Sequence, residues 1–307
     1  MYQYWPESAR WVSELLHEDH IVVNTEIQKD IENEGSADFR KISLCLQKAT
    51  SRALCLNIML LVSRLTKAEL EKRCRIGNLM HYVYAGSLLH DDVMPIGCDA
   101  ERILSTDIGG RNASAILLGD FLYSKAFQLM TRTDNLVVCQ ILSDSLNQLS
   151  QGRCLKQILL TSDRFVNNAL FSVADRSLGS LIRASISLGL EIGVKNCELA
   201  DDLHAYGLGL SRLIYLDLLL DVLENKGNAE CDGQQNLLLH FSLTKSQADI
   251  YEFIHSVNLE ERKRVFGALW KIKDSTVRLA LTELIPNNRL PLALFELEEP
   301  ELERNVA

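Results

Sequence analysis

The feature that most restricts the fold of this chain is the distribution of its prolines. The five prolines are Pro6, Pro95, Pro286, Pro291 and Pro300, and none lies between Pro95 and Pro286. Proline removes a backbone donor and clashes with the preceding helical turn, so the long interval without it can be continuously helical. The same interval is rich in Leu, Ala, Glu, Lys and Arg and shows little β-branched alternation. These properties predict an all-α chain.

Apolar residues at helical spacing predict a series of helices. One or two amphipathic helices are expected over 6–34, within an N-terminal helical extension over 1–35, and residues 296–307 form an acidic tail. Hydrophobic residues make up 47% of the chain, and no repeat or linker divides it, so residues 1–307 are expected to form a single large helical domain. The remaining helices are expected over Phe39–Arg64, Lys67–Val93, Arg111–Met130, 134–160, 165–193, 198–225, 244–257, 259–272 and 275–284.

Charge and composition argue against several classes of function. The net charge is −9 and no clustered basic face is visible, which disfavours binding to nucleic acid. The most apolar stretch, Leu208–Leu223, contains Arg212, Asp217 and Asp221, so it predicts a buried helix and no transmembrane segment. Residues Met1–Asp19 carry several acids, unlike a transit peptide. The eight cysteines form no CxxC pair, which indicates buried thiols in a reducing compartment.

Two adjacent aspartates end an apolar helical stretch in Leu88-Leu89-His90-Asp91-Asp92-Val93. Paired carboxylates of this kind are typical of a magnesium site that binds a diphosphate. Such a site needs a third carboxylate close by, and one placed four residues after the first would share its helical face. Pro95 occupies that position, and the next carboxylate is Asp99. Asp91 and Asp92 are therefore either a residual metal site or a remnant whose carboxylates are solvated or bonded to nearby backbone.

Four segments, taken in order and spacing, resemble the trans-prenyl diphosphate synthases. These segments are Ser87–Val93, Asn112-Ala113, Leu118-Gly119-Asp120-Phe121-Leu122, and Tyr206-Gly207 ahead of an apolar helix. The resemblance covers residues 36 to 240 and implies the isoprenoid synthase fold, a helical bundle around a central apolar cavity. In that family, two aspartate-rich motifs on facing helices hold magnesium ions. The metals stabilise the charge that develops on the leaving diphosphate as an allylic cation forms.

The second aspartate motif of that family is degraded in this chain. Counting from Tyr206-Gly207, the aspartate doublet falls on Leu218 and Leu219. Asp217 and Asp221 form an i, i+4 pair one residue early, and a one-residue deletion upstream would move them into the first and last positions of the motif. The doublet is absent in either alignment.

Other polar positions of the family pattern are also replaced. The Gly-Glu turn reads Gly152-Arg153, the Lys-Thr pair reads Ser177-Leu178, and the arginines after the first motif read Ala100-Glu101. The segment that binds isopentenyl diphosphate keeps only Arg40. Loss of polar groups while apolar positions persist implies a scaffold without catalytic or cofactor-binding residues. Asp91 and Asp92 remain as remnant candidates for metal binding, and Asp217 with Asp221 is expected to be a buried or interfacial polar pair.

That pattern resembles subunit 2, the non-catalytic subunit, of heteromeric decaprenyl and solanesyl diphosphate synthases. The resemblance implies a heterotetramer with a catalytic subunit, which holds the magnesium and makes the ubiquinone side chain in mitochondria. The present chain would then need no cofactor of its own and would stabilise its partner. Two alternatives stay open. One is a divergent active synthase that uses Asp91, Asp92 and Asp99 with magnesium, and the other is an isoprenoid-binding scaffold.

The helix expected over Arg111–Met130 has little polar face, which is typical of a helix covered by its own domain or by a partner subunit. Members of the resembled family dimerise through the matching helix. The resemblance therefore implies a subunit interface on this helix. The residues expected at that interface are Ile116, Leu117, Asp120, Phe121 and Ser124.

Overall fold

The protein is all-helical in a computed structural model that describes residues 5–6, 9–32, 37–91, 93, 111–160, 167–194, 197–224 and 246–286. No β-strand occurs within these ranges, and the all-α prediction is confirmed. The described helices are α1 (Arg10–Leu15), α2 (His17–Glu32), α3 (Ala37–Thr50), α4 (Leu54–Leu65), α5 (Leu70–Asp91), α6 (Arg111–Thr131), α7 (Leu136–Leu160), α8 (Asn167–Arg176), α9 (Leu178–Glu191), the 3₁₀ turn η2 (Cys197–Leu199), α10 (Ala200–Glu224), α12 (Gln247–Trp270) and α13 (Ser275–Glu283).

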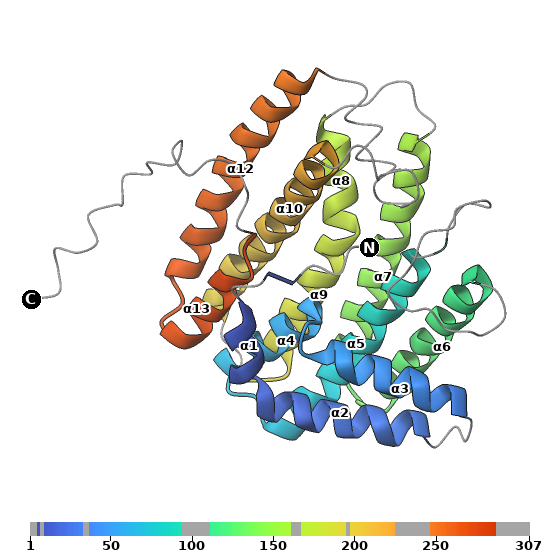
Figure 1. Cartoon of the computed structure of the whole chain (residues 1–307). Coiled ribbons are helices and arrows are strands. Elements are labelled where there is room, and N and C mark those ends of the chain that lie inside the picture. The colour runs from blue at the N-terminus through green and yellow to red at the C-terminus, as the bar shows by residue number, and fades with distance from the viewer. Residues whose placement is uncertain are drawn as a thin grey trace, which may run out of the picture.

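Helix α9 lies inside the bundle, packed against α4, α7 and α10 (Figure 1). Helix α4 is mostly apolar and is buried at every residue from Leu54 to Ser63, as expected of a helix wrapped by its own domain. Gly189 lets the two helices approach closely, because a Cβ at this position would fall 2.8 Å from Val62 Cβ and 2.9 Å from the Met59 carbonyl oxygen. Helix α12 packs on α10, while α2 and α3 pair with each other across one end of the bundle (Figure 1).

The N-terminal helices are part of the hydrophobic core. Val12, Leu16 and Ile27 are fully buried, and α2 packs against α3 and α5. The carboxylate of Asp19 on α2 is fully buried and accepts hydrogen bonds from Arg64 on α4 and Arg73 on α5. One carboxylate therefore ties three helices together. The acidic tail over 296–307 lies outside the described residues.

Two of the expected helices are broken, and the prediction of continuous helices there is wrong. The helix expected over Phe39–Arg64 ends at Thr50 and restarts at Leu54. In the break, the carbonyl oxygen of Ser51 accepts bonds from Ser13 Oγ at 2.9 Å and Asn57 Nδ2 at 3.2 Å. The helix expected over 165–193 breaks at Ser177, whose hydroxyl donates to the Val173 carbonyl at 2.6 Å. Hydroxyl side chains compete for backbone partners, which weakens a helix locally.

The division expected between 244–257 and 259–272 is also wrong, because α12 continues through it. Asn258 is fully buried in the middle of this helix, and its Oδ1 accepts a hydrogen bond from Arg262 Nε at 2.8 Å. The low helix propensity of asparagine costs well under ~1 kcal/mol, so the packing of α12 against α10 decides the outcome. The helix expected over Arg111–Met130 is confirmed as α6.

Candidate functional site

The candidate site is centred on the last turn of α5, which carries Asp91. Leu89 anchors this turn in the core and leaves the Asp91 carboxylate directed toward α7, with 14% of its side chain exposed. The neighbouring Asp92 and the substitute carboxylate Asp99 lie outside the described residues, as do Ala100 and Glu101. Asp91 is therefore the one remnant metal candidate that can be placed.

Arg153 on α7 is bonded directly to Asp91. Its Nε donates to Asp91 Oδ1 at 2.9 Å, and its Nη2 donates to the Ser87 carbonyl oxygen at 2.8 Å. Arg153 stands where the resembled family has the glutamate of its Gly-Glu turn. The positive charge that replaces the glutamate is therefore paired with the negative charge of Asp91. The guanidinium neutralises Asp91 and also satisfies a carbonyl near the C-terminus of α5, where positive charge is favourable.

The electrostatics of the pair favour both charged forms. Burial raises the pKa of the Asp91 carboxyl. Positive groups around it, Arg153 and Lys156 among them, lower that pKa by more than burial raises it, so the pKa lies below the usual value. Burial lowers the pKa of the Arg153 guanidinium, and the negative charge of Asp91 more than offsets that effect. The two side chains therefore form a persistent ion pair at neutral pH.

Polar groups from α10 and from the α8–α9 junction gather beside this pair. Burial raises the pKa of the Tyr215 hydroxyl to about 12; a hydrogen bond with Ser177 opposes the rise and the charge of Asp91 adds to it. Ser177 stands where the family has a lysine that contacts diphosphate. Its short hydroxyl is buried and donates to the Val173 carbonyl, so it supplies no positive charge. Among the described residues, this region thus holds the Asp91–Arg153 ion pair and the buried hydroxyls of Ser177 and Tyr215.

The positions assigned to the second aspartate doublet belong to α10. Leu219 is 0% exposed and is part of the hydrophobic core, while Leu218 packs partly buried against it. Asp217 is half-buried on the same helix, and the side chain of Asp221 lies outside what the structure describes. Leucine offers a metal no ligand atom, so Leu218 and Leu219 cannot contribute to a metal cluster.

The described residues do not fit a magnesium ion at Asp91. Magnesium in proteins is held by oxygen ligands at about 2.0–2.1 Å. The Asp91 oxygen that faces α7 already accepts a hydrogen bond from a positively charged guanidinium. Within the described ranges, no group of three or more His, Cys, Asp or Glu side chains is arranged to hold a metal ion.

His90, next to Asp91, contacts α6. Its Nε2 lies 3.2 Å from Asp120 Oδ1 and 3.3 Å from the Ile116 carbonyl oxygen, and its ring meets the Tyr123 ring edge-on with 5.1 Å between centroids. Asp120, expected at a subunit interface, thus bonds to α5 while its side chain stays largely exposed. The last turn of α5 is held from one side by α6 and from the other by α7.

The outer face of α6 exposes apolar side chains. Leu117 is 67% exposed and Ile116 is 43% exposed, whereas Leu122 and Ala126 on the opposite face pack against the rest of the bundle. Exposed apolar residues gathered on one helix face are typical of a protein interaction site. All five residues expected at the interface lie on this helix; Ile116, Leu117, Asp120 and Ser124 are exposed and Phe121 is half-buried.

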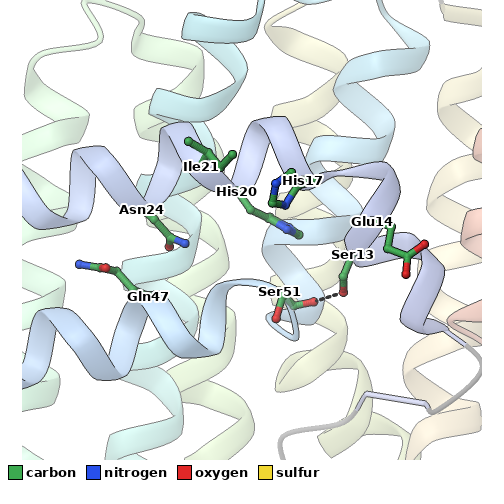
Figure 2. Close-up of a pocket in the computed structure, with 8 residues that line it drawn as sticks. All are labelled: Ser13, Glu14, His17, His20, Ile21, Asn24, Gln47 and Ser51. Carbon is green, nitrogen blue, oxygen red and sulfur yellow. Dashed lines mark hydrogen bonds between the residues drawn. The ribbon is translucent and has the colours of Figure 1, made fainter.

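An open pocket of about 560 Å³ lies away from these motifs, between the N-terminal helices (Figure 2). Asn24 on α2 faces Gln47 on α3 across it, and Ser13 bonds the Ser51 carbonyl at one end. The full lining is Ser13, Glu14, His17, His20, Ile21, Asn24, Gln47 and Ser51. The His20 ring is bonded to Asn57 Oδ1 at 2.7 Å, so this histidine has a structural partner inside the core. The lining contains no residue of the aspartate-rich motifs.

The sequence predicts Asp91 as a site residue and shows the charge reversal at Arg153, but it does not predict that the two side chains meet. The two residues are 62 positions apart, and no local pattern links them. Tyr215 was missed entirely, because a tyrosine within an apolar helix has no distinguishing sequence signal. The signal that predicts this contact is an opposite charge at each of two motif positions, a carboxylate at Asp91 and a guanidinium at Arg153.

Comparison with known proteins gives consistent matches. Residues 39–234 match the family described as polyprenyl synthetase. The octaprenyl diphosphate synthase of Escherichia coli K12 is 21% identical over 224 residues, 73% of this chain and 67% of that protein. A probable mitochondrial hexaprenyl pyrophosphate synthase of Yarrowia lipolytica is 25% identical over 169 residues, 47% of this chain and 37% of that protein. The crystal structure of a decaprenyl diphosphate synthase from Rhodobacter capsulatus aligns with a TM-score of 0.71 and 21% identity, covering 91% of this chain and 97% of that one.

The structural match extends the isoprenoid synthase fold to nearly the whole chain.

None of the helices within the described ranges has the length and apolar content that crossing a membrane requires.

Proposed function

Because the chain belongs to the polyprenyl synthetase family, we propose that it is the non-catalytic subunit of a heteromeric long-chain trans-polyprenyl diphosphate synthase. In this role it stabilises a catalytic partner that holds the magnesium ions, within a heterotetramer. The complex supplies the polyprenyl side chain of ubiquinone in mitochondria. Relatives named for octaprenyl and mitochondrial hexaprenyl products support the long-chain product and the location.

The observation that carries the non-catalytic role is the bond between Arg153 and Asp91. Ionisation of an allylic diphosphate needs metal ions at the leaving group, and the carboxylates of the first motif must be open to hold them. In this chain the leading carboxylate of the motif is neutralised by Arg153 at 2.9 Å. Leu219, at a doublet position of the second motif, is buried in the core. Both sides of the expected metal cluster are therefore compromised.

The partner role is supported by the exposed apolar face of α6. Leu117 and Ile116 leave apolar area in contact with water, and covering it with a second subunit would favour association. The transfer term is roughly 25 cal/mol per Å² buried, from which the entropic cost of association is subtracted. The resemblance assigns subunit contacts to this helix. A non-catalytic chain that keeps this surface can act on a catalytic partner through contact alone.

The function is tested by co-expressing the chain with a full-motif prenyl diphosphate synthase from the same organism. We expect the two chains to co-purify, and we expect the complex to convert farnesyl and isopentenyl diphosphates into long-chain product by chromatography. The lone chain is expected to release no pyrophosphate with magnesium. Changing both Asp91→Asn and Asp92→Asn is expected to leave the activity of the complex nearly unchanged.

Two outcomes would contradict the proposal. Magnesium-dependent pyrophosphate release by the lone chain, abolished by Asp91→Asn, would indicate a divergent active synthase. Failure to co-purify with a catalytic chain, together with tight binding of isoprenoid diphosphate, would indicate a binding scaffold.

A further inference from the structure

Arg153 makes contacts that fix both ends of its guanidinium. Nε reaches Asp91 Oδ1 at 2.9 Å and Nη2 reaches the Ser87 carbonyl at 2.8 Å, both near the C-terminus of α5. The Ser87 carbonyl lies near the helix C-terminus, where positive charge is favourable. Moving the arginine away would remove this donor from Ser87 and one positive partner from Asp91. The side chain is three-quarters buried, at 26% exposure, so the pair is only partly screened by solvent.

Gly152 explains why Arg153 can occupy this place. A Cβ at Gly152 would lie 3.0 Å from both Arg176 Cβ and Ser177 Oγ, and 3.1 Å from the Arg176 carbonyl carbon. The absence of a side chain lets α7 pack closely on the junction between α8 and α9. The next residue, Arg153, then spans from α7 to the end of α5 and lies on the side of α7 that faces Asp91.

We propose that Arg153 is a built-in replacement for the metal cation, which closes the Asp91 site to divalent ions. A buried carboxylate requires a positive partner. In a metal-dependent synthase that partner is an exchangeable ion, whereas here it is a covalently attached guanidinium that no chelator removes. The inference deepens the proposed function and rests on it in treating the Asp91 site as non-catalytic. It predicts in addition that removing the positive charge of Arg153 opens the site to a divalent ion.

Electrostatic repulsion from Arg153 sets how strongly a divalent ion is expected to be excluded from Asp91. A divalent ion that bound Asp91 would lie within a few ångströms of the guanidinium charge. At the effective dielectric constant of a partly buried site, repulsion at that range amounts to several times the thermal energy. Removing the charge at Arg153 is therefore expected to raise the affinity of the Asp91 site for a divalent ion by about tenfold or more.

The experiment measures Mn²⁺ binding to the lone chain by electron paramagnetic resonance, with Mg²⁺ as competitor. We expect the wild-type chain and its Asp91→Asn variant to bind Mn²⁺ equally weakly. We expect Arg153→Gln to gain saturable Mn²⁺ binding that Mg²⁺ displaces. The double variant Arg153→Gln with Asp91→Asn should lose that gain, which assigns the bound ion to Asp91.

Two further variants separate charge from shape. Arg153→Lys keeps the positive charge and is expected to stay without metal, while circular dichroism checks that each variant is folded. Arg132→Gln removes an exposed arginine just after α6 and is expected to leave Mn²⁺ binding unchanged, which controls for net charge.

Two results would overturn the inference. One is Mn²⁺ binding by the wild-type chain that Asp91→Asn abolishes, a result that does not depend on the folding of any Arg153 variant. The other is a folded Arg153→Gln chain that gains no binding. Neither result concerns a partner subunit, so they are distinguishable from failure of co-purification or product synthesis.

Discussion

Gly119 on α6 lies directly against His90 on α5, and a Cβ at Gly119 would fall 2.1 Å from His90 Cδ2. The same Cβ would lie 3.2 Å from the Gly86 carbonyl oxygen, and a Cβ at Gly86 would lie 3.1 Å from the Gly119 carbonyl oxygen. The two helices therefore meet at a pair of glycines. This close approach brings the His90 ring to Asp120 and links the motif-bearing turn of α5 to the exposed helix α6.

Gly119→Ala is expected to lower the free energy of unfolding by about 1–3 kcal/mol, because the added methyl overpacks the contact with His90. The sign is informative, since alanine in a helix normally stabilises by about 1 kcal/mol relative to glycine. Adding His90→Ala to the same chain should restore much of the loss. Urea unfolding of the two single variants and the double variant measures this coupling.

The matched control is Gly267→Ala on α12, where a Cβ would meet nothing within 4 Å. This variant is expected to be more stable than wild type by about 0.5–1 kcal/mol. If Gly119→Ala were stabilised to the same extent, that result would contradict the close contact between Gly119 on α6 and His90 on α5.

Asp19→Asn is expected to destabilise the protein by about 3 kcal/mol, because two arginines would lose the buried carboxylate that pairs them. Burial raises the pKa of Asp19, but Arg73 and Arg64 lower it by more, so its pKa lies below the usual value. Its contribution is therefore present at neutral pH and is lost as the pH falls through the unfolded-state pKa of 3.8 toward the lower folded-state value.

The control for this prediction is Glu71→Gln, which removes a carboxylate from a surface pair with Arg75. Glu71 is 83% exposed, and surface pairs of this kind contribute about 0–1 kcal/mol. In thermal and urea unfolding, the loss of unfolding free energy should be several-fold larger for Asp19→Asn than for Glu71→Gln. Equal small effects would show that Asp19 does not hold α2 to α4 and α5.

The helices were predictable because apolar periodicity is a local property, and α6 matches its expected bounds within one residue. What failed depends on contacts between distant residues. The break after Thr50 depends on Ser13, which bonds the Ser51 carbonyl from 38 residues away. The Asp91 site could be located from its doublet, but its neutralisation by Arg153 depends on how α7 packs near α5. Asp92 and Asp99 lie outside the described residues, so the remnant role of Asp92 and the substitute role of Asp99 stay predictions.

The buried His81 is expected to make the free energy of unfolding depend on pH. It is fully buried, and burial lowers its pKa from 6.5 to about 4 despite a hydrogen bond with the Leu46 carbonyl at 3.1 Å. The unfolded imidazole binds a proton near pH 6.5, whereas the folded one does so only near pH 4. The folded state therefore loses stability as the pH falls from 6.5 toward 4, by about 3 kcal/mol in total from this group.

The measurement is the free energy of unfolding in urea at several pH values across that interval. His81→Gln removes the titrating ring, so its stability should fall less steeply with acidification, by up to about 1.4 kcal/mol per pH unit. His17→Gln changes an exposed histidine on α2 and should alter the slope only slightly, through the effect of its charge on the pKa of His20. An unchanged slope in His81→Gln would show that the ring is not held neutral by burial.

Leu117→Glu tests whether the apolar face of α6 is the partner surface. Leu117 is 67% exposed, so a glutamate there stays solvated in the lone chain, and its unfolding free energy should change by less than about 0.5 kcal/mol. In a complex the same carboxylate would be buried against the catalytic subunit without a partner, which should weaken association by about tenfold or more. Leu279→Glu on α13, where the leucine is 52% exposed, places an equal charge on another helix and should leave association intact. Co-purification and sedimentation of the three complexes measure the difference, and equal retention of Leu117→Glu and wild type would move the partner surface away from α6.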